Sequence, residues 1–300
     1  MLHEGKRRRI SAAPFEDRIV HHALVRCIEP RFEALFLPDS YANRVGRGTH
    51  RAVLRLQQFC RRHPWVLRLD VRQHFARIDH AILRQLLWRH VPEPGLRWVI
   101  DLILNSGTDI HTPDAPPELL PGDDLLALSR PCGLPIGNLT SQFWSNCYLD
   151  PLDQFVRRTL RQPAYLRYVD DFALFDTDRA RLEDAGHAIR QFLQERLRLR
   201  VHESSAQVQP CAAGVPWLGF VVYPQHIRVK GRKVVEATRR LRYWHAQWQD
   251  GHIPFAELDA RVHGWIAHVA QADSWGLRAH VLGQLPLQTG LAAGLGRPKP

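Results

Sequence analysis

The acidic residues best suited to chemistry are Asp70 and the adjacent pair Asp170 and Asp171. Asp70 lies near the end of a predicted strand, 65–71, and the pair lies at the tip of a predicted apolar hairpin, 165–175. Neighbouring aspartates repel each other unless a cation lies between them. Mg²⁺ binds one or two carboxylates together with substrate phosphates, and two such ions can activate a hydroxyl and stabilise a leaving oxygen. The alternative is a solvated turn, in which Asp is common.

Alternating strands and helices are expected to position these acids. Apolar residues at helical spacing predict a helix across 20–28 that Pro30 ends, a second helix that runs to about residue 62, and a third that begins at Asp79. The other expected elements are helices over 137–160 with a kink at Pro151, over 178–196 and over most of 233–283, a loop or short hairpin at 105–130, and strands at 199–202, near Val208 and at 217–223. This pattern indicates an α/β (α+β) body followed by a helical module.

The charge of the chain indicates a polyanionic partner. Its 300 residues include 41 Lys and Arg against 30 Asp and Glu, which gives a net charge of +11, and only four of the basic residues are lysines. A charge of this sign suits nucleic acid, and the planar guanidinium group suits phosphate. A GC-rich genome would equally explain the preference for Arg over Lys, but it does not explain the net charge.

The same composition argues against several classes of protein. A hydrophobic content of 45% is typical of a globular chain rather than a disordered one. No apolar run approaches the ~18 residues of a membrane helix, and the first ten residues lead into no apolar segment of a secretory signal. The five cysteines form no CxxC pair, which argues against a zinc knuckle or a disulfide scaffold and favours a cytoplasmic protein.

The residues around the acids resemble two motifs of reverse transcriptases. Tyr168-Val169-Asp170-Asp171 between two apolar strands resembles the catalytic hairpin of these enzymes. The segment 69–80, Leu-Asp-Val-Arg-Gln-His-Phe-Ala-Arg-Ile-Asp-His, resembles their first acidic motif. The motifs occur in the order of the family, and their separation leaves room for the helices of a polymerase palm. The resemblance covers nearly the whole chain.

Further segments resemble one subfamily, the reverse transcriptases of diversity-generating retroelements. Residues 133–142, Gly-Leu-Pro-Ile-Gly-Asn-Leu-Thr-Ser-Gln, look like its fourth motif, where group II intron enzymes typically carry a Gln-Gly…Ser-Pro form. Segments 9–23, 39–50 and 214–220 are similar to the same subfamily. The resemblance implies an error-prone RNA-directed DNA polymerase that copies a template RNA into cDNA and works with a small basic accessory protein.

The resemblance also implies a right-hand polymerase fold, with a palm, truncated fingers and a C-terminal helical thumb. The expected boundaries are 1–62 for partial fingers and the start of the palm, 63–225 for the palm with the catalytic acids, 226–283 for the thumb, and 284–300 for a flexible tail. No membrane association is expected.

The site residues follow by matching position. The resemblance implies two Mg²⁺ ions held by Asp70, Asp170 and Asp171. The reaction would be attack of a cDNA primer 3′-hydroxyl on the α-phosphate of a dNTP, with release of pyrophosphate. Nucleotide binding is implied for Lys6, Arg8, Arg9, Phe75 and Gln142, and template–primer contact for Trp217, Gly219, Arg239 and Arg240.

Several of these positions also have an ordinary structural interpretation. A core aromatic after a strand explains Phe75 as well as a gate that excludes a ribose 2′-hydroxyl. Polar groups at the start of a helix explain Gln142, a buried strand explains Trp217, and a solvated charged run explains Lys6–Arg9. For 228–242, with seven basic residues and one acid, the alternatives are a thumb that grips a duplex through its phosphates and a solvated helix face.

Two positions depart from the pattern of the family. Met1 falls just before its second motif, which predicts that part of the fingers is missing, and Ser205 stands where a lysine usually protonates the leaving pyrophosphate. Two alternatives therefore remain beside the diversity-generating enzyme. One is an inactive RNA-binding relic of a reverse transcriptase, and the other is a reverse transcriptase of a retron or group II intron type. In each case we expect a cytoplasmic protein encoded by a prokaryote or a phage.

Overall fold

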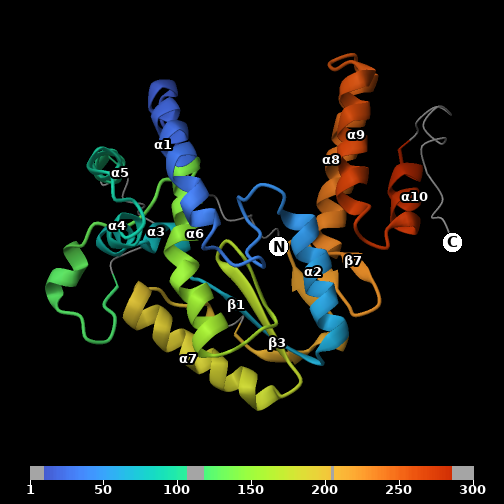
Figure 1. Cartoon of the computed structure of the whole chain (residues 1–300). Coiled ribbons are helices and arrows are strands. Elements are labelled where there is room, and N and C mark those ends of the chain that lie inside the picture. Colours follow the sequence, from blue (N-terminus) through green and yellow to red (C-terminus); the bar gives the residue numbers. More distant parts are fainter. Residues whose placement is uncertain (1–9, 107–117, 204–205, 286–300) are drawn as a thin grey trace. The chain divides into compact units, whose positions relative to one another are not determined.

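The computed structural model describes residues 10–106, 118–203 and 206–285 (Figure 1). The chain divides into two compact units. The first consists of Met1–Ala52 and Trp65–Gln209, and the second of Val53–Pro64 and Pro210–Pro300. Both combine helices with a sheet, which confirms the predicted mixed fold class. The division into fingers, palm and thumb stays a prediction, and the predicted tail lies outside the described residues from position 286 onward.

The first unit contains a four-stranded sheet with the strand order β2-β3-β1-β4. The strands are β1 (Trp65–Asp70), β2 (Tyr165–Tyr168), β3 (Asp171–Asp176) and β4 (Val208–Pro210). Strand β3 runs antiparallel to both β1 and β2. The sheet therefore joins two segments that are far apart in the sequence, and it places the end of β1 beside the start of β3.

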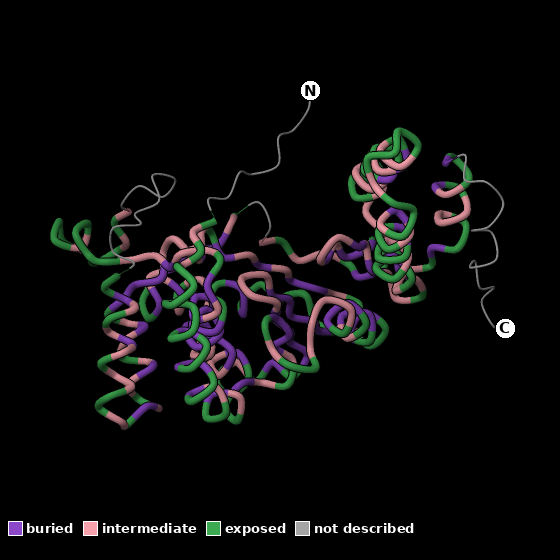
Figure 2. The backbone as a smooth tube through the Cα atoms, turned by 90° about the horizontal axis from the view of Figure 1, so that it is seen from above, coloured by how far each residue is buried: buried purple, intermediate pink, exposed green. Residues whose placement is uncertain are grey.

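Helices form the rest of this unit. They are α1 (Phe15–Glu33), α3 (His74–Arg77), α4 (His80–Trp88), α5 (Pro94–Ser106), α6 (Leu139–Gln154) and α7 (Arg179–Leu197), with a 3-10 helix at Leu125–Ser129 and a π-helical turn at Phe155–Thr159. Alternate strand residues enter the core, because successive side chains of a strand point to opposite faces. Leu67 and Leu69 of β1 and Phe172 and Leu174 of β3 pack with residues of α6 and α7. Buried and exposed residues alternate along the long helices (Figure 2).

Most predicted element positions in this unit are confirmed. Helix α4 begins directly after Asp79, whose carboxylate accepts hydrogen bonds from the backbone N–H groups of Ala81 and Ile82. This is the usual role of an aspartate at a helix start. Helix α6 passes through Pro151 and continues into the π-helical turn, so the long helix ends near the expected residue 160.

Two element predictions are wrong. Helix α1 does not end at Pro30 but continues to Glu33. A proline near the end of a helix removes one backbone hydrogen bond, and the buried side chain of Phe32 holds the last turn against the core. Residues 199–202 form no strand. Only Val201 makes an isolated bridge, to Val71. The pairing extends no further because β1 ends at Asp70 and the chain then turns into α3 at His74.

The second unit contains a three-stranded antiparallel sheet and helices. The strands are β5 (Val215–Trp217), β6 (Phe220–Val222) and β7 (Ile227–Val229), and the helices are α8 (Gly231–Gln249), α9 (Phe255–Val269), α10 (Trp275–Gly283) and the part of α2 (Thr49–Arg62) that follows Ala52. Leu241, Leu258 and Val262 belong to a small core that joins α8 to α9. The helical region predicted from 233 to 283 is thus confirmed as three helices. None of the described helices is long and apolar enough to cross a membrane.

Candidate active site

The acid turn, residues 168–171, connects β2 to β3. Tyr168 pairs with Asp171 across the hairpin, so Val169 and Asp170 form a two-residue turn. Asp70 is the cross-strand partner of Asp171, and the backbone N–H of Val71 donates to the carbonyl of Asp170 at 3.0 Å. The structure therefore brings the backbones of Asp70, Asp170 and Asp171 together at one end of the sheet.

Two of the acids lie on the sheet face opposite the helix-covered core. Directly opposed residues of antiparallel strands share a face, so Asp70 and Asp171 point to the same side. Arg68 shares that side because it precedes Asp70 by two residues, and its Nε donates to Asp171 Oδ1 at 3.2 Å. The sequence interpretation missed Arg68, although the two-residue alternation of the strand placed it beside the acids.

The electrostatics of this face favour a cation. Burial, together with the negative charges of Asp70 and Asp170, raises the pKa of Asp171 to about 7 against the lowering effect of Arg68. One guanidinium group therefore does not balance the three carboxylates. A divalent cation bound there would relieve the remaining repulsion.

The residues present fit Mg²⁺ that shares its ligands with a substrate. Carboxylate oxygens are suitable ligands, and the Asp70 side chain is 34% exposed. Within the described ranges, no group of three or more His, Cys, Asp or Glu residues is arranged to hold a metal ion. Two carboxylates completed by substrate phosphates remain compatible with this finding. The two ions and the three-aspartate ligand set stay predictions.

Residues after Leu199 approach Asp70 from a third segment. The backbone N–H of His202 donates to the carbonyl of Asp70 at 2.8 Å, and Nε2 of its ring lies 3.9 Å from Asp70 Oδ2. Next to it, the N–H of Arg72 donates to the carbonyl of Arg200 at 2.7 Å. Ser205, two residues beyond Glu203, lies outside the described residues, so its predicted departure from the family's lysine has no structural test.

The predicted nucleotide-binding residues fall in three places. Phe75 lies on the short helix α3, half-buried against the core, and its carbonyl accepts from the N–H of Leu134 at 2.7 Å. Gln142 is exposed in the first turn of α6. Lys6, Arg8 and Arg9 lie outside the described residues. The position of Phe75 is compatible with both of its interpretations.

The predicted template–primer residues belong to the second unit. Trp217 is fully buried in β5, so its side chain is not available to nucleic acid, and a contact here would fall to the backbone of the following turn. That turn contains Gly219 with φ +92°. Arg239 and Arg240 are exposed on α8 and free of the small core. Their role stays a prediction.

A buried histidine lies behind the acidic face. Nε2 of His74 is 2.8 Å from Ser145 Oγ of α6. Complete burial, with the positive charge of Arg167 adding to its effect, lowers the pKa of His74 to about 3. The ring is therefore neutral at pH 7 and serves as a hydrogen-bonding group inside the unit.

Two known proteins are similar to this chain in sequence. The chain is 24% identical over 269 residues to Protein YkfC of Escherichia coli K12, covering 77% of this chain and 67% of that protein. It is 32% identical over 108 residues to nuclear intron maturase 1, mitochondrial, of Arabidopsis thaliana, covering 35% of this chain and 15% of that one. The chain thus spans about two thirds of the first relative and a small part of the second.

Solved telomerase structures share the fold. Telomerase from Candida tropicalis in complex with a fragment of telomeric RNA superposes with a TM-score of 0.53 at 11% identity, over 88% of this chain and 49% of that one. Its apo form lacking the C-terminal domain gives 0.51 at 11% identity, over 70% and 45%. Residues 3–222, which include the acid turn and both acidic motifs, match the family described as reverse transcriptase (RNA-dependent DNA polymerase). The chain therefore belongs to the reverse transcriptase family.

Proposed function

We propose that this protein is an RNA-directed DNA polymerase that extends a cDNA primer on a template RNA by two-metal nucleotidyl transfer. The observation that carries the proposal is the register of β1 and β3, which sets Asp70 opposite Asp171 with Asp170 in the adjoining turn. Family membership supports the same reaction class. We further propose that the enzyme is error-prone and part of a diversity-generating retroelement, which rests on the motif at 133–142.

Different residues of the chain are proposed for different parts of this reaction. Asp70 and Asp170 would hold Mg²⁺ jointly with the dNTP phosphates, and Asp171 is a third acid whose charge Arg68 partly balances. Two bound ions would activate the primer 3′-hydroxyl and stabilise the leaving oxygen. Phe75, five residues after Asp70, would exclude a ribose 2′-hydroxyl.

The proposed partners follow from charge. The net charge of +11 suits template RNA and the growing cDNA, and Arg239 and Arg240 are exposed for contact with their phosphates. Lys6, Arg8, Arg9 and Gln142 are proposed for the incoming dNTP. A small basic accessory protein is proposed on the subfamily resemblance alone, as is a cytoplasmic location in a prokaryotic or phage-infected cell.

Two other candidates each have one observation in their favour. Ser205 in place of the family's lysine favours an inactive RNA-binding relic, because that position would lack a general acid for pyrophosphate. Identity of 32% to the Arabidopsis intron maturase over 108 residues favours an intron-type enzyme. The three candidates differ in whether cDNA is made and in its error pattern.

Primer extension with purified protein tests the proposal. The wild type should extend a DNA primer on RNA, with errors concentrated opposite template adenines. Asp170→Asn should abolish extension yet bind RNA normally, because affinity comes mainly from phosphate contacts. Asp184→Asn, the same change at an exposed position of α7, should extend like the wild type. Binding without extension by the wild type would establish the relic, and extension by Asp170→Asn would refute the assigned acids.

A binding measurement in the same experiment tests the proposed role of the exposed arginines on α8. Reversal of both Arg239 and Arg240 to Glu should weaken template–primer binding for every sequence and reduce the salt slope by about one per lost phosphate contact. A control with the same charge change, Arg158→Glu with Arg196→Glu, uses exposed arginines of the first unit. Equal losses in both double variants would show that only net charge matters.

A further inference from the structure

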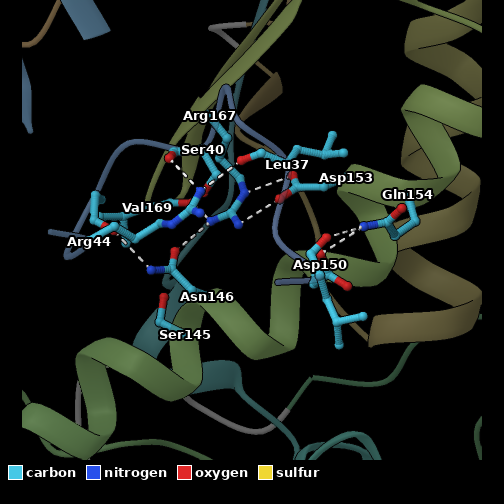
Figure 3. A network of polar contacts seen from close by, with 12 residues as sticks. Leu37, Ser40, Arg44, Ser145, Asn146, Asp150, Asp153, Gln154, Arg167 and Val169 are labelled. Carbon is cyan, nitrogen blue, oxygen red and sulfur yellow. Dashed lines mark hydrogen bonds and ion pairs between the residues drawn. The ribbon is translucent and has the colours of Figure 1, made fainter. Parts of the chain in front are cut away.

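A fully buried arginine lies beneath the acid turn (Figure 3). Arg167 of β2 donates from Nε and Nη2 to the two carboxylate oxygens of Asp153 on α6, at 2.8 and 2.7 Å. Its Nη1 donates to Asn146 Oδ1 at 3.1 Å and to the carbonyl of Val169 at 3.0 Å. One guanidinium group therefore joins α6 to the turn that carries Asp170.

The charge of Arg167 is compensated inside the protein. Both Arg167 and Asp153 have side chains with 0% exposure, and the Tyr165 hydroxyl donates to Asp153 Oδ1 at 2.6 Å. A planar fork of this kind matches a carboxylate with two parallel hydrogen bonds. The guanidinium group is thus out of reach of any substrate, and it can influence chemistry only through the groups it holds.

Arg167 is itself fixed along the backbone. Its N–H donates to the carbonyl of Asp39 at 3.0 Å, and its carbonyl accepts from the N–H of Tyr41 at 2.9 Å. Asn146, its side-chain partner, donates from Nδ2 to the carbonyl of Ala42 at 2.9 Å. The same short segment therefore holds both the backbone of Arg167 and one of its side-chain partners.

The turn needs such support because its conformation is strained. Val169 has φ +56°, which a β-branched residue rarely adopts. Strained residues persist where surrounding contacts determine them, and they cluster at functional sites. The Val169 carbonyl belongs to the peptide group before Asp170, and Arg167 holds it. The carbonyl of Asp170 itself is held by the N–H of Val71. Both peptide groups that flank Asp170 are thereby fixed.

We propose that Arg167 is the positioning residue of the acid turn. By holding the Val169 carbonyl it fixes the peptide plane before Asp170, and so the direction in which the Asp170 carboxylate points. The proposal rests on the proposed polymerase function for its effect on rate, but its effect on the turn can be measured without any activity.

The test compares two buried arginines. Arg167→Lys keeps the positive charge beside Asp153 but cannot reach the carboxylate and the Val169 carbonyl together, because lysine lacks the fork. The matched control is Arg44→Lys. Arg44 has a side chain only 4% exposed, pairs with Glu33, and donates to the carbonyls of Leu37 and Ser40, but not to the turn.

The expected result separates rate from binding. Arg167→Lys should lower the single-turnover rate of nucleotide addition by about 10²-fold, the effect of misplacing a reacting group by about 1 Å. It should leave the KM for dNTP and the affinity for template–primer within about twofold. Hydrogen exchange of the backbone should speed up by at least about tenfold across 168–171 in Arg167→Lys and remain at the wild-type rate there in Arg44→Lys.

Two outcomes overturn the proposal. Wild-type exchange across 168–171 in Arg167→Lys would show that the turn holds itself, whether or not the protein polymerises. A rate loss and faster exchange across 168–171 of the same size in Arg44→Lys, which loosens the segment beside Arg167 at Ser40, would show that this segment and not the Arg167 side chain holds the turn. Absence of extension by the wild type contradicts the proposed function instead, and the exchange measurement still decides the role of Arg167.

A second variant covers the case in which Arg167→Lys does not fold. Arg167→Met combined with Asp153→Leu and Tyr165→Phe removes the buried charges and the hydroxyl together, so no buried charge is left unpaired. Among the partners of Arg167, Asn146 Oδ1 and the Val169 carbonyl lose this donor. Such replacements often preserve stability. Fast exchange across 168–171 in this folded variant supports the proposal, and wild-type exchange there overturns it.

Discussion

Among the described residues, two hairpins have two-residue turns, one in each compact unit. In the first unit, Val169 and Asp170 connect β2 to β3, and in the second, Leu218 and Gly219 connect β5 to β6. The first residue of each turn has a positive φ, +56° at Val169 and +44° at Leu218. The two hairpins thus impose a similar conformational demand on different residues.

The turns meet this demand in different ways. Gly219 has φ +92°, and glycine is the residue preferred at the second position of a turn with two positive φ values. The acid turn has no glycine, and only its first residue has a positive φ: Asp170, at the second position, is not among the described residues with positive φ. Its support comes from Arg167 and Val71, which hydrogen bond to its carbonyls. Each turn also receives a backbone N–H on the carbonyl of its second residue, from Val71 at Asp170 and from Lys230 at Gly219. The acid turn differs in having a glycine at neither position and in having a buried side chain, Arg167, that holds the carbonyl of its first residue.

The largest expected effect is a loss of folding stability at low pH. It arises in the first unit, where His74 lies behind the first hairpin. The pKa of His74 is lowered to about 3 in the folded chain, against about 6.5 when unfolded. As the pH falls below 6.5 the unfolded chain binds the proton first, so the folded state loses stability. The loss at pH 4.5 should be about 2–3 kcal/mol.

Urea unfolding at pH 7.5 and 4.5 measures this loss. Asp171, with its pKa raised to about 7, changes stability in the opposite direction over this range and does so in every variant. His74→Gln, which keeps an N–H group for Ser145, should therefore shift the difference between the two pH values by about 2–3 kcal/mol relative to the wild type. His187→Gln, at an exposed position of α7, should retain it. The same acid sensitivity in all three proteins would mean that His74 is not the group that titrates.

A smaller effect is expected at the second turn. Gly219→Ala should lower the free energy of unfolding by about 1–2 kcal/mol, because an L-residue at positive φ is strained. A Cβ atom there would come no closer than 4.0 Å to its nearest neighbour, the Lys233 side chain, so the cost is that of the backbone alone. Thermal or urea unfolding checks it. A neutral result would show that this turn does not depend on its glycine.

The smallest effect sharpens the comparison at the acid turn. Val169→Gly relieves roughly 1–2 kcal/mol of strain but adds roughly 0.5–1 kcal/mol of chain entropy to the unfolded state. The free energy of unfolding should therefore rise by about 0.5 kcal/mol. Leu218→Gly, the matched change in the other hairpin, should give a smaller gain because leucine is not β-branched. A clear loss of stability in Val169→Gly would mean that Val169 contributes packing that outweighs its strain.

Much of the fold could be predicted from local patterns. The strand predicted at 65–71 from its β-favouring residues and the helix start at Asp79 depend on neighbours in the sequence, and both are confirmed. Pro30 was interpreted by the same local rules and the prediction was wrong, because the buried side chain of Phe32 outweighs the missing hydrogen bond. The strand expected at 199–202 does not form, because β1, the strand beside it, ends at Asp70 and offers no longer partner.

In the candidate site, too, some features follow from the local sequence and others only from contacts between distant segments. The motif around Asp170 identifies the acids, and a two-residue alternation would have identified Arg68 as their neighbour. Nothing in the local sequence indicates that Arg167 is buried. Alternation alone does not distinguish it from a solvent-exposed charge on the same strand.

The sequence by itself determined the reverse transcriptase family and the order of the motifs, and it predicts the three acids of the site, because these depend on residue type and on spacing along the chain. Only the tertiary structure decided how the acids are held. Arg167 meets Asp153 of α6, and Asn146 meets the carbonyl of Ala42, 104 residues away. Such contacts depend on how distant segments pack, and a buried charge is stable only where packing supplies its partners.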